Sequence, residues 1–131
     1  DRVAIAMRNY PEWITAFAAI TSVGAIAVSM NAWWKVDELA YGLEDSGARV
    51  LICDTERLGN ALTPLATTEL RAVVVRGEGP LPDGADHLDA VMELGTPLPE
   101  VTIDPDDEIT GAMLVTRGGE VVHPRVKEAL S

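Results

Sequence analysis

The sequence has little cysteine and little histidine, and both shortages limit the chemistry it can carry. Cys53 is the single cysteine in 131 residues, which excludes an intrachain disulfide and a cysteine-rich metal cluster. The two histidines, His87 and His123, lie far apart in the sequence, so a metal site at either one would need several carboxylates. We therefore expect no metal site and interpret both histidines as surface residues.

Basic residues and long apolar runs are also scarce. The chain has 10 Lys and Arg residues against 21 Asp and Glu residues, which gives a formal net charge of −11. Nucleic acids and anionic membrane surfaces bind basic segments, so this balance argues against both as partners. No apolar run is long enough to cross a bilayer, and no segment has the pattern of a signal peptide. We expect a cytoplasmic location, in keeping with the single cysteine.

Short apolar segments alternate with amphipathic segments along the chain. Strands are predicted at residues 3–7, 25–30, 49–54, 70–75 and 113–116. Helices are predicted at residues 11–23, 36–46, 55–65 and 87–94, with Thr55 as the cap of the third. This alternation is typical of parallel strands joined by right-handed crossovers. The predicted fold class is therefore α/β, a three-layer sandwich around a mostly parallel sheet.

Four residues near the predicted strand ends are candidates for a role in binding or in contacts: Cys53, Asp54, Trp33 and Trp34. Cys53 ends an apolar strand, where a free cysteine is usually a small buried hydrophobic residue. Asp54 follows at the sheet edge where open α/β folds bind ligands, so a ligand role is the alternative to a structural one. The adjacent Trp33 and Trp34 lie in a predicted loop and are expected to contact a part of the protein outside this segment. Asp1 enters a strand directly, which leads us to expect upstream sequence as well.

Two stretches of the sequence carry a family pattern. The first, DRVAIAMRNYPEWITAFAAITSVGAIAVSMN, opens the chain, and the second, DELAYGLEDSGARVLICD, spans residues 37–54. The pattern residues of the second stretch are Glu38, Leu39, Tyr41, Leu43, Asp45, Ser46, Ala48, Leu51 and Ile52. Together the stretches resemble the N-terminal region of the AMP-binding, adenylate-forming superfamily, and within it the acyl-CoA synthetases (fatty-acid–CoA ligases). The resemblance covers residues 1–75 and implies that residues 1–108 are an α/β scaffold subdomain of the synthetase's large domain.

Residues 109–131 are a divergent tail at the place of the family's phosphate loop, TSGTTGxPKG. The resemblance assigns Thr116, Gly118, Gly119 and Arg125 to a degenerate form of this loop, where they would bind the phosphates of ATP. The loop's Ser/Thr cluster is absent, and Glu120 would place a negative charge beside the phosphates. The alternatives are a β-hairpin around the Gly-Gly turn, a disordered tail, or a tail foreign to the family through a frameshift, engineering or divergence.

The resemblance implies an acid–thiol ligase that uses ATP, Mg²⁺ and CoA. A carboxylate from a fatty acid or another hydrophobic acid attacks the α-phosphate and gives an acyl-adenylate and pyrophosphate, after which CoA displaces AMP. The family's downstream motifs have no match in this sequence, so we predict no catalytic residue. We expect the chain to be inactive alone and to hold no ATP, Mg²⁺ or CoA. Its expected partner is the remainder of the synthetase or a self-associating copy.

Two other classes of function remain open on the sequence. A non-catalytic α/β binding or oligomerisation module would show the same alternation of strands and helices. A flavodoxin-like or receiver-like signalling domain also fits the alternation, although Arg8 and Asn9 stand where an acidic pair would follow the first strand.

Overall fold

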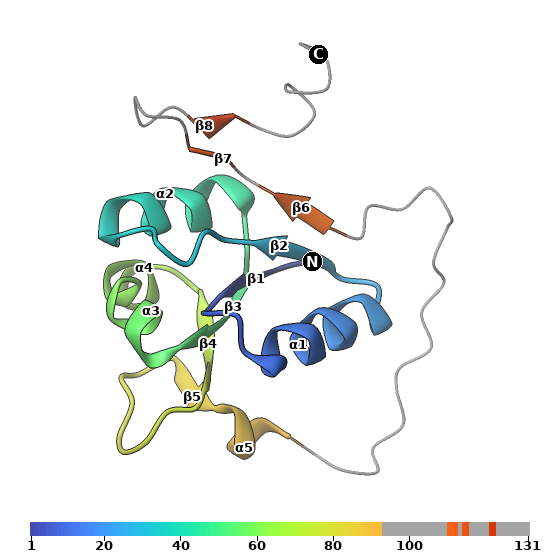
Figure 1. Cartoon of the computed structure of the whole chain (residues 1–131). Helices are drawn as coiled ribbons and strands as arrows, with labels where there is room; N and C mark the ends of the chain where they lie inside the picture. Colours follow the sequence, from blue (N-terminus) through green and yellow to red (C-terminus); the bar gives the residue numbers. More distant parts are fainter. Residues whose placement is uncertain (93–109, 113, 116–120, 123–131) are drawn as a thin grey trace.

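A single parallel sheet forms the centre of the protein (Figure 1). The computed structural model describes residues 1–92, 110–112, 114–115 and 121–122. The six strands of the sheet lie in the order β5-β4-β3-β1-β2-β6, and every neighbouring pair is parallel. Their bounds are β1 Arg2–Ala6, β2 Ile26–Ser29, β3 Val50–Asp54, β4 Arg71–Val75, β5 Ala85–His87 and β6 Thr110–Ala112.

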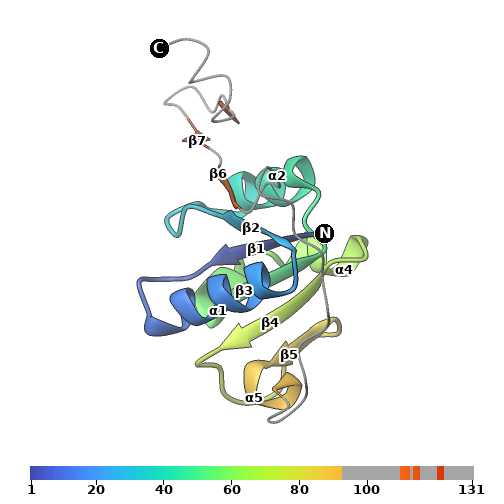
Figure 2. The same ribbon diagram turned by 90° about the vertical axis from the view of Figure 1, so that its right-hand side faces the viewer.

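Helices cover both faces of the sheet. On one face lie α1 (Pro11–Ser22) and the short α5 (Leu88–Val91). On the other lie α2 (Val36–Ser46), α3 (Thr55–Gly59) and α4 (Leu62–Thr67). Figure 2, turned by 90°, shows α1 in front of the strands and α2 and α4 behind them. The predicted three-layer α/β architecture is confirmed.

Strand β1 is the centre of the core because it pairs with β2 on one side and β3 on the other. Its residues Ala4, Ile5 and Ala6 are 0% exposed. Successive side chains of a strand point to opposite faces, so Ile5 packs in the layer under α1, whereas Ala4 and Ala6 pack under α2, α3 and α4. A strand buried on both faces consists of consecutive apolar residues, which is why this segment could be predicted.

The first two helices begin and end at residues with clear sequence signals. Pro11 occupies the first turn of α1, where its missing N–H leaves no hydrogen bond unmade. Gly24 just after α1 has a φ of 76°, and Gly47 at the end of α2 has a φ of 68°. Both values lie in the left-handed region that glycine adopts without a Cβ clash. The predicted ends of these helices are confirmed.

The third predicted helix differs from the structure. Residues 55–65 were expected to form one helix, but two short helices, α3 and α4, are present. The break arises because Pro64 has no N–H and its ring fits only the first turn of a helix. The cap is also different: the side chain of Asp54, rather than Thr55, accepts a hydrogen bond from the N–H of Arg57.

The end of the sheet also differs from the prediction. The last parallel strand is β6 at residues 110–112 rather than 113–116. The apolar residues after it form β7 (Leu114–Val115), which pairs with β8 (Val121–Val122) in a separate antiparallel ladder. Strand β5 was not predicted, because Ala85, Asp86 and His87 have no apolar pattern and owe their conformation to pairing with β4.

Replacing glycine by alanine within a helix usually stabilises it, but we expect the opposite at Gly42 in α2. A Cβ at this position would lie 2.6 Å from Cζ3 of the buried Trp34 and 3.2 Å from Sδ of Met30. We predict that Gly42→Ala lowers the free energy of unfolding by about 1–3 kcal/mol, because overpacking displaces the indole ring. The control is Gly59→Ala in α3, where a Cβ meets no atom within 4 Å. Chemical denaturation measures both, and a stabilised Gly42→Ala variant would contradict the packing.

Candidate functional site

The connections of the sheet diverge to opposite faces between the ends of β1 and β3. All the parallel strands end at one edge, the carboxyl edge. The chain leaves β1 toward α1 on one face and leaves β3 toward α3 on the other. Ligands of open α/β sheets bind where adjacent strands diverge in this way. Arg8 follows β1 and Asp54 ends β3, so these two residues flank the point of divergence.

A buried ion pair between Asp54 and Arg57 lies at this point of the sheet edge. The two side chains are 7% and 3% exposed, and Nη1 of Arg57 lies 3.2 Å from Oδ2 of Asp54. Asp54 also accepts two backbone hydrogen bonds, from the N–H of Arg57 at 2.9 Å and from the N–H of Arg8 at 3.1 Å. The carboxylate therefore caps α3 and holds the loop after β1.

The guanidinium of Arg57 reaches a third loop. Its Nε donates to the carbonyl oxygen of Ala32 at 2.8 Å, in the connection between β2 and α2. Its Nη1 also donates to Oε2 of the exposed Glu56 at 3.0 Å. We name Asp54 and Arg57 the loop clamp, because together they hold the segments that follow β1, β2 and β3. Among residues 1–92, every buried side-chain nitrogen and oxygen has a hydrogen-bond partner.

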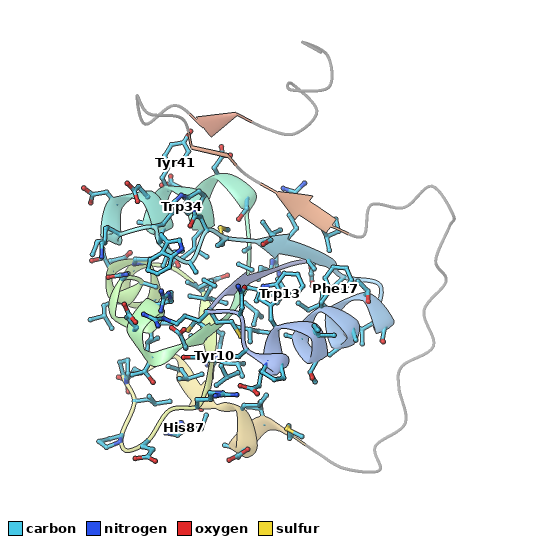
Figure 3. All side chains as sticks on the ribbon, viewed as in Figure 1. Tyr10, Trp13, Phe17, Trp34, Tyr41 and His87 are labelled. Atoms are coloured by element: carbon cyan, nitrogen blue, oxygen red, sulfur yellow. The ribbon has the colours of Figure 1, made fainter. Side chains whose placement is uncertain are left out.

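Above the clamp, Trp33 is the most exposed large apolar side chain at this edge. Its side chain is 74% exposed, and the Arg8 guanidinium lies 5.8 Å from the centroid of its ring. Arg8 also lies 3.8 Å from Oε2 of Glu56. Trp34 is different: it is 5% exposed and packs under α2 (Figure 3). The two tryptophans therefore do not act together, and only Trp33 is free to make the contact expected of the pair.

A cleft with a volume of about 650 Å³ lies beyond the ends of β4 and β5. Its wall includes Arg76, a non-glycine residue with a φ of 54°. This left-handed conformation is held by Glu12, which accepts a hydrogen bond from Nη2 at 3.2 Å, and by Tyr10, whose ring centroid is 4.2 Å from the guanidinium. The hydrogen bond from Arg76 lowers the pKa of Glu12, and Glu12 in turn raises the pKa of Arg76.

His87 lies in the wall of the same cleft. The sequence suggested an ordinary surface histidine, but the ring is half-buried and its Nε2 lies 2.7 Å from the carbonyl oxygen of Gly79. His123 lies outside the described residues. Within residues 1–92 and the short strands that are described, no group of three His, Cys, Asp or Glu side chains could hold a metal ion.

The arginines described at the carboxyl edge are engaged with carboxylates. Phosphate sites need cationic groups and N–H donors that are free to face the ligand. The arginines at this edge are each paired with a carboxylate: Arg8 with Glu56, Arg57 with Asp54, and Arg76 with Glu12. The clamp consequently has a structural role, and the ligand role considered for Asp54 is replaced by capping and ion pairing.

The residues predicted for the phosphate loop, Thr116, Gly118, Gly119 and Arg125, lie outside the described residues. Leu114–Val115 pairs with Val121–Val122 in antiparallel register, as the hairpin alternative expects of its two strands. Residues 116–120, which would form the turn, lie outside the described residues. The phosphate-loop assignment itself stays a prediction.

Sequence reasoning missed Arg57. The signal was present as Asp54-Thr55-Glu56-Arg57, since an Asp at the N-cap accepts from the N–H three residues later. Arginine is normally a surface residue, and its burial here depends on Ala32, which lies 25 residues earlier in the chain. Local sequence therefore predicts the cap and not the buried ion pair.

Removing one charge of the loop clamp should destabilise the fold strongly. We predict that Asp54→Asn lowers the free energy of unfolding by about 3–5 kcal/mol, because the buried Arg57 loses its buried counter-ion and keeps only the exposed Glu56, while the shape is kept. The matched control is Glu56→Gln, whose carboxylate is 62% exposed and should contribute less than about 1 kcal/mol. Urea denaturation measures both variants. Equal, small losses would show that the clamp does not hold the edge.

Burial of the Cys53 thiol makes the free energy of unfolding depend on pH in the alkaline range. Its thiol is 0% exposed, as predicted, and burial together with the Asp54 charge raises its pKa to about 12. The unfolded thiol loses its proton near its ordinary pKa of about 8.5, so between these values the unfolded state binds fewer protons and stability falls as pH rises. We predict that the wild type loses up to about 1.4 kcal/mol per pH unit more than Cys53→Ala over this range. Parallel curves for the two proteins would contradict it.

No helix among the described residues has both the length and the apolar character that a membrane span requires.

The comparisons with known proteins agree on one family. The model of the AMP-binding enzyme family matches residues 1–111. Over 115 residues the chain is 31% identical to a probable CoA ligase, CCL9, of Humulus lupulus, and the match covers 82% of this chain and 21% of that protein. It is 32% identical over 111 residues to the 3-hydroxybenzoate/4-hydroxybenzoate–CoA ligase of Thauera aromatica, again covering 82% of this chain and 21% of that protein.

The solved structures extend the match to the fold. The anthranilate CoA ligase AuaEII in complex with anthranoyl-AMP superposes with a TM-score of 0.78 at 29% identity, over 94% of this chain and 24% of that one. The chain thus spans about a fifth of the length of its curated relatives. The resemblance found in the sequence is confirmed and reaches beyond residue 75. By its family match, its curated relatives and its fold, this chain belongs to the AMP-binding enzyme family.

Proposed function

We propose that this chain is the α/β scaffold of an AMP-forming CoA ligase that activates a hydrophobic carboxylic acid. The observation that carries the proposal is the match of 94% of the chain to a CoA ligase whose structure holds an acyl-adenylate. A curated relative acts on hydroxybenzoates, so an aryl acid joins the fatty acids implied by the sequence pattern. The complete reaction would use ATP, Mg²⁺ and CoA and release AMP and pyrophosphate, in the cytoplasm.

The described residues support a positioning role rather than a chemical one. The loop clamp fixes the three loops that follow β1, β2 and β3, and the arginines at this edge are neutralised by carboxylates. Groups that bind phosphate and activate the carboxylate would come from other parts of the polypeptide. Among these groups, the one nearest in the sequence would be the phosphate loop, with the candidates Thr116, Gly118, Gly119 and Arg125.

The alternative is a non-catalytic α/β binding or oligomerisation module. The paired arginines support this module as much as they support the ligase scaffold, because a module without chemistry needs no unpaired cation at its sheet edge. The two proposals differ in what the polypeptide encoded by the whole gene does with ATP.

Pyrophosphate release separates the two. We predict no release above the enzyme-free rate when the 131-residue chain is given ATP, Mg²⁺, CoA and a panel of 4-hydroxybenzoate, anthranilate and palmitate, because the described residues supply no free phosphate site. The polypeptide encoded by the whole gene should release pyrophosphate with at least one acid.

The controls for this assay are omission of the acid and omission of CoA. Turnover by the 131-residue chain alone would overturn the scaffold role. Failure of the longer polypeptide with every acid would favour the non-catalytic module.

A further inference from the structure

Helix α1 is the one long helix of the described residues whose outer side carries no charge. After Glu12 in its first turn, the sequence WITAFAAITS contains no charged residue, in a chain whose net charge is −11. Helix α2, of similar length, carries Asp37, Glu38, Glu44 and Asp45. A surface helix normally has charged and polar residues on its solvent side. The outer side of α1 is therefore unlike that of a helix that stays in water.

The exposed residues of α1 form one continuous stripe. After Pro11 in the first turn they are Ile14, Thr15, Ala18, Ala19 and Ser22, spaced at three and four residues, and we call these five the α1 outer face. Ile14 is 70% exposed, which is unusual for a β-branched apolar side chain. Trp13 and Phe17, stacked with centroids 5.7 Å apart, belong to the inner side and pack toward the sheet (Figure 3).

Of the two hydroxyl groups on this face, that of Ser22 is already used within the helix. The Ser22 hydroxyl donates to the carbonyl oxygen of Ala18 at 2.6 Å, and the Thr21 hydroxyl beside it donates to that of Phe17 at 3.0 Å. Apart from the Thr15 hydroxyl, the face consequently offers mainly aliphatic groups. Small side chains such as Ala18 and Ala19 also let another helix approach closely, within the distances of about 8–10 Å found for packed helices.

Two observations indicate what covers the α1 outer face. Each copy of the chain carries a net charge of −11, so two copies repel each other before their α1 faces can meet. The relatives are much longer: this chain covers 21% of the curated ligases and 24% of the anthranilate ligase structure. A protein of that length has ample polypeptide to cover one helix.

We propose that the α1 outer face is an internal interface, covered by an apolar and uncharged face of the remaining CoA ligase polypeptide. This inference rests on the proposed function, because it takes the remainder of such a ligase as the partner. It adds which side of the scaffold is covered and the chemistry of the covering surface. The opposite side, with the acidic α2, remains in contact with water.

Thiol labelling tests the interface directly, since Cys53 is buried and unreactive in the chain. Ala18→Cys places a thiol on the α1 outer face, and the matched control Ala66→Cys places one on an exposed site of α4, on the other side of the sheet. Both should react quickly with a maleimide in the 131-residue chain. In the polypeptide encoded by the whole gene, we expect labelling at position 18 to slow by about tenfold or more while position 66 is unchanged.

Each other outcome overturns the proposal. Equal labelling of position 18 in both proteins would leave the face uncovered. Slow labelling already in the 131-residue chain would assign the face to this chain's own residues, or to a second copy where the rate falls as protein concentration rises. Pyrophosphate release by the longer polypeptide is measured separately, so failure of the interface and failure of the ligase activity are distinguishable.

A charge at the same position gives an independent measurement. Ala18→Lys should change the melting temperature of the 131-residue chain by less than about 2 °C, because the side chain stays in water. In the longer polypeptide it should lower the melting temperature by about 5 °C or more, because the ammonium is buried without a partner. Ala66→Lys should change neither protein, and equal effects of the two lysines would contradict the interface.

Discussion

The ion pair between Asp54 and Arg57 determines how the carboxyl edge of this sheet is organised. A buried arginine is stable only if its charge and its N–H groups are matched, and Arg57 meets this demand with Asp54, Glu56 and the carbonyl oxygen of Ala32. Asp54 and Glu56 lie at the β3–α3 connection and Ala32 lies in the β2–α2 connection, so these two segments cannot move independently. The scaffold therefore has its edge preformed, at the place where open α/β sheets bind ligands.

Charge is distributed unevenly over the rest of the molecule. The acidic residues of α2 face water, whereas α1 presents an apolar stripe after a single Glu at its first turn. Glu12 is already ion-paired: it holds Arg76 in a left-handed backbone conformation beside the β4–β5 cleft. The arginines of the edge are neutralised in the same way. The proposed scaffold role, in which other segments supply the chemistry, fits this charge distribution and the share of its relatives that the chain spans.

The strands and helix ends that depend on residues adjacent in the sequence could be predicted. Apolar runs such as Val3 to Met7 indicated buried strands, and Pro11 and Gly47 indicated helix ends, all of which the structure confirms. What could not be predicted depends on distant partners: β5 takes its conformation from β4, and Arg57 is buried by a carbonyl group 25 residues away. Trp33 and Trp34 were indistinguishable in the sequence, and only packing under α2 separates the buried ring from the exposed one. The candidate phosphate-loop residues stay predictions.

The most direct test of the central claim, a preformed edge held by the loop clamp, is native-state hydrogen exchange of two backbone amides. The N–H groups of Arg8 and Arg57 both donate to the Asp54 carboxylate. In the 131-residue chain without any ligand, both should exchange only through global unfolding, with the same denaturant dependence as the amides of β1. Exchange of either amide through local opening, well before β1 is exposed, would contradict the account.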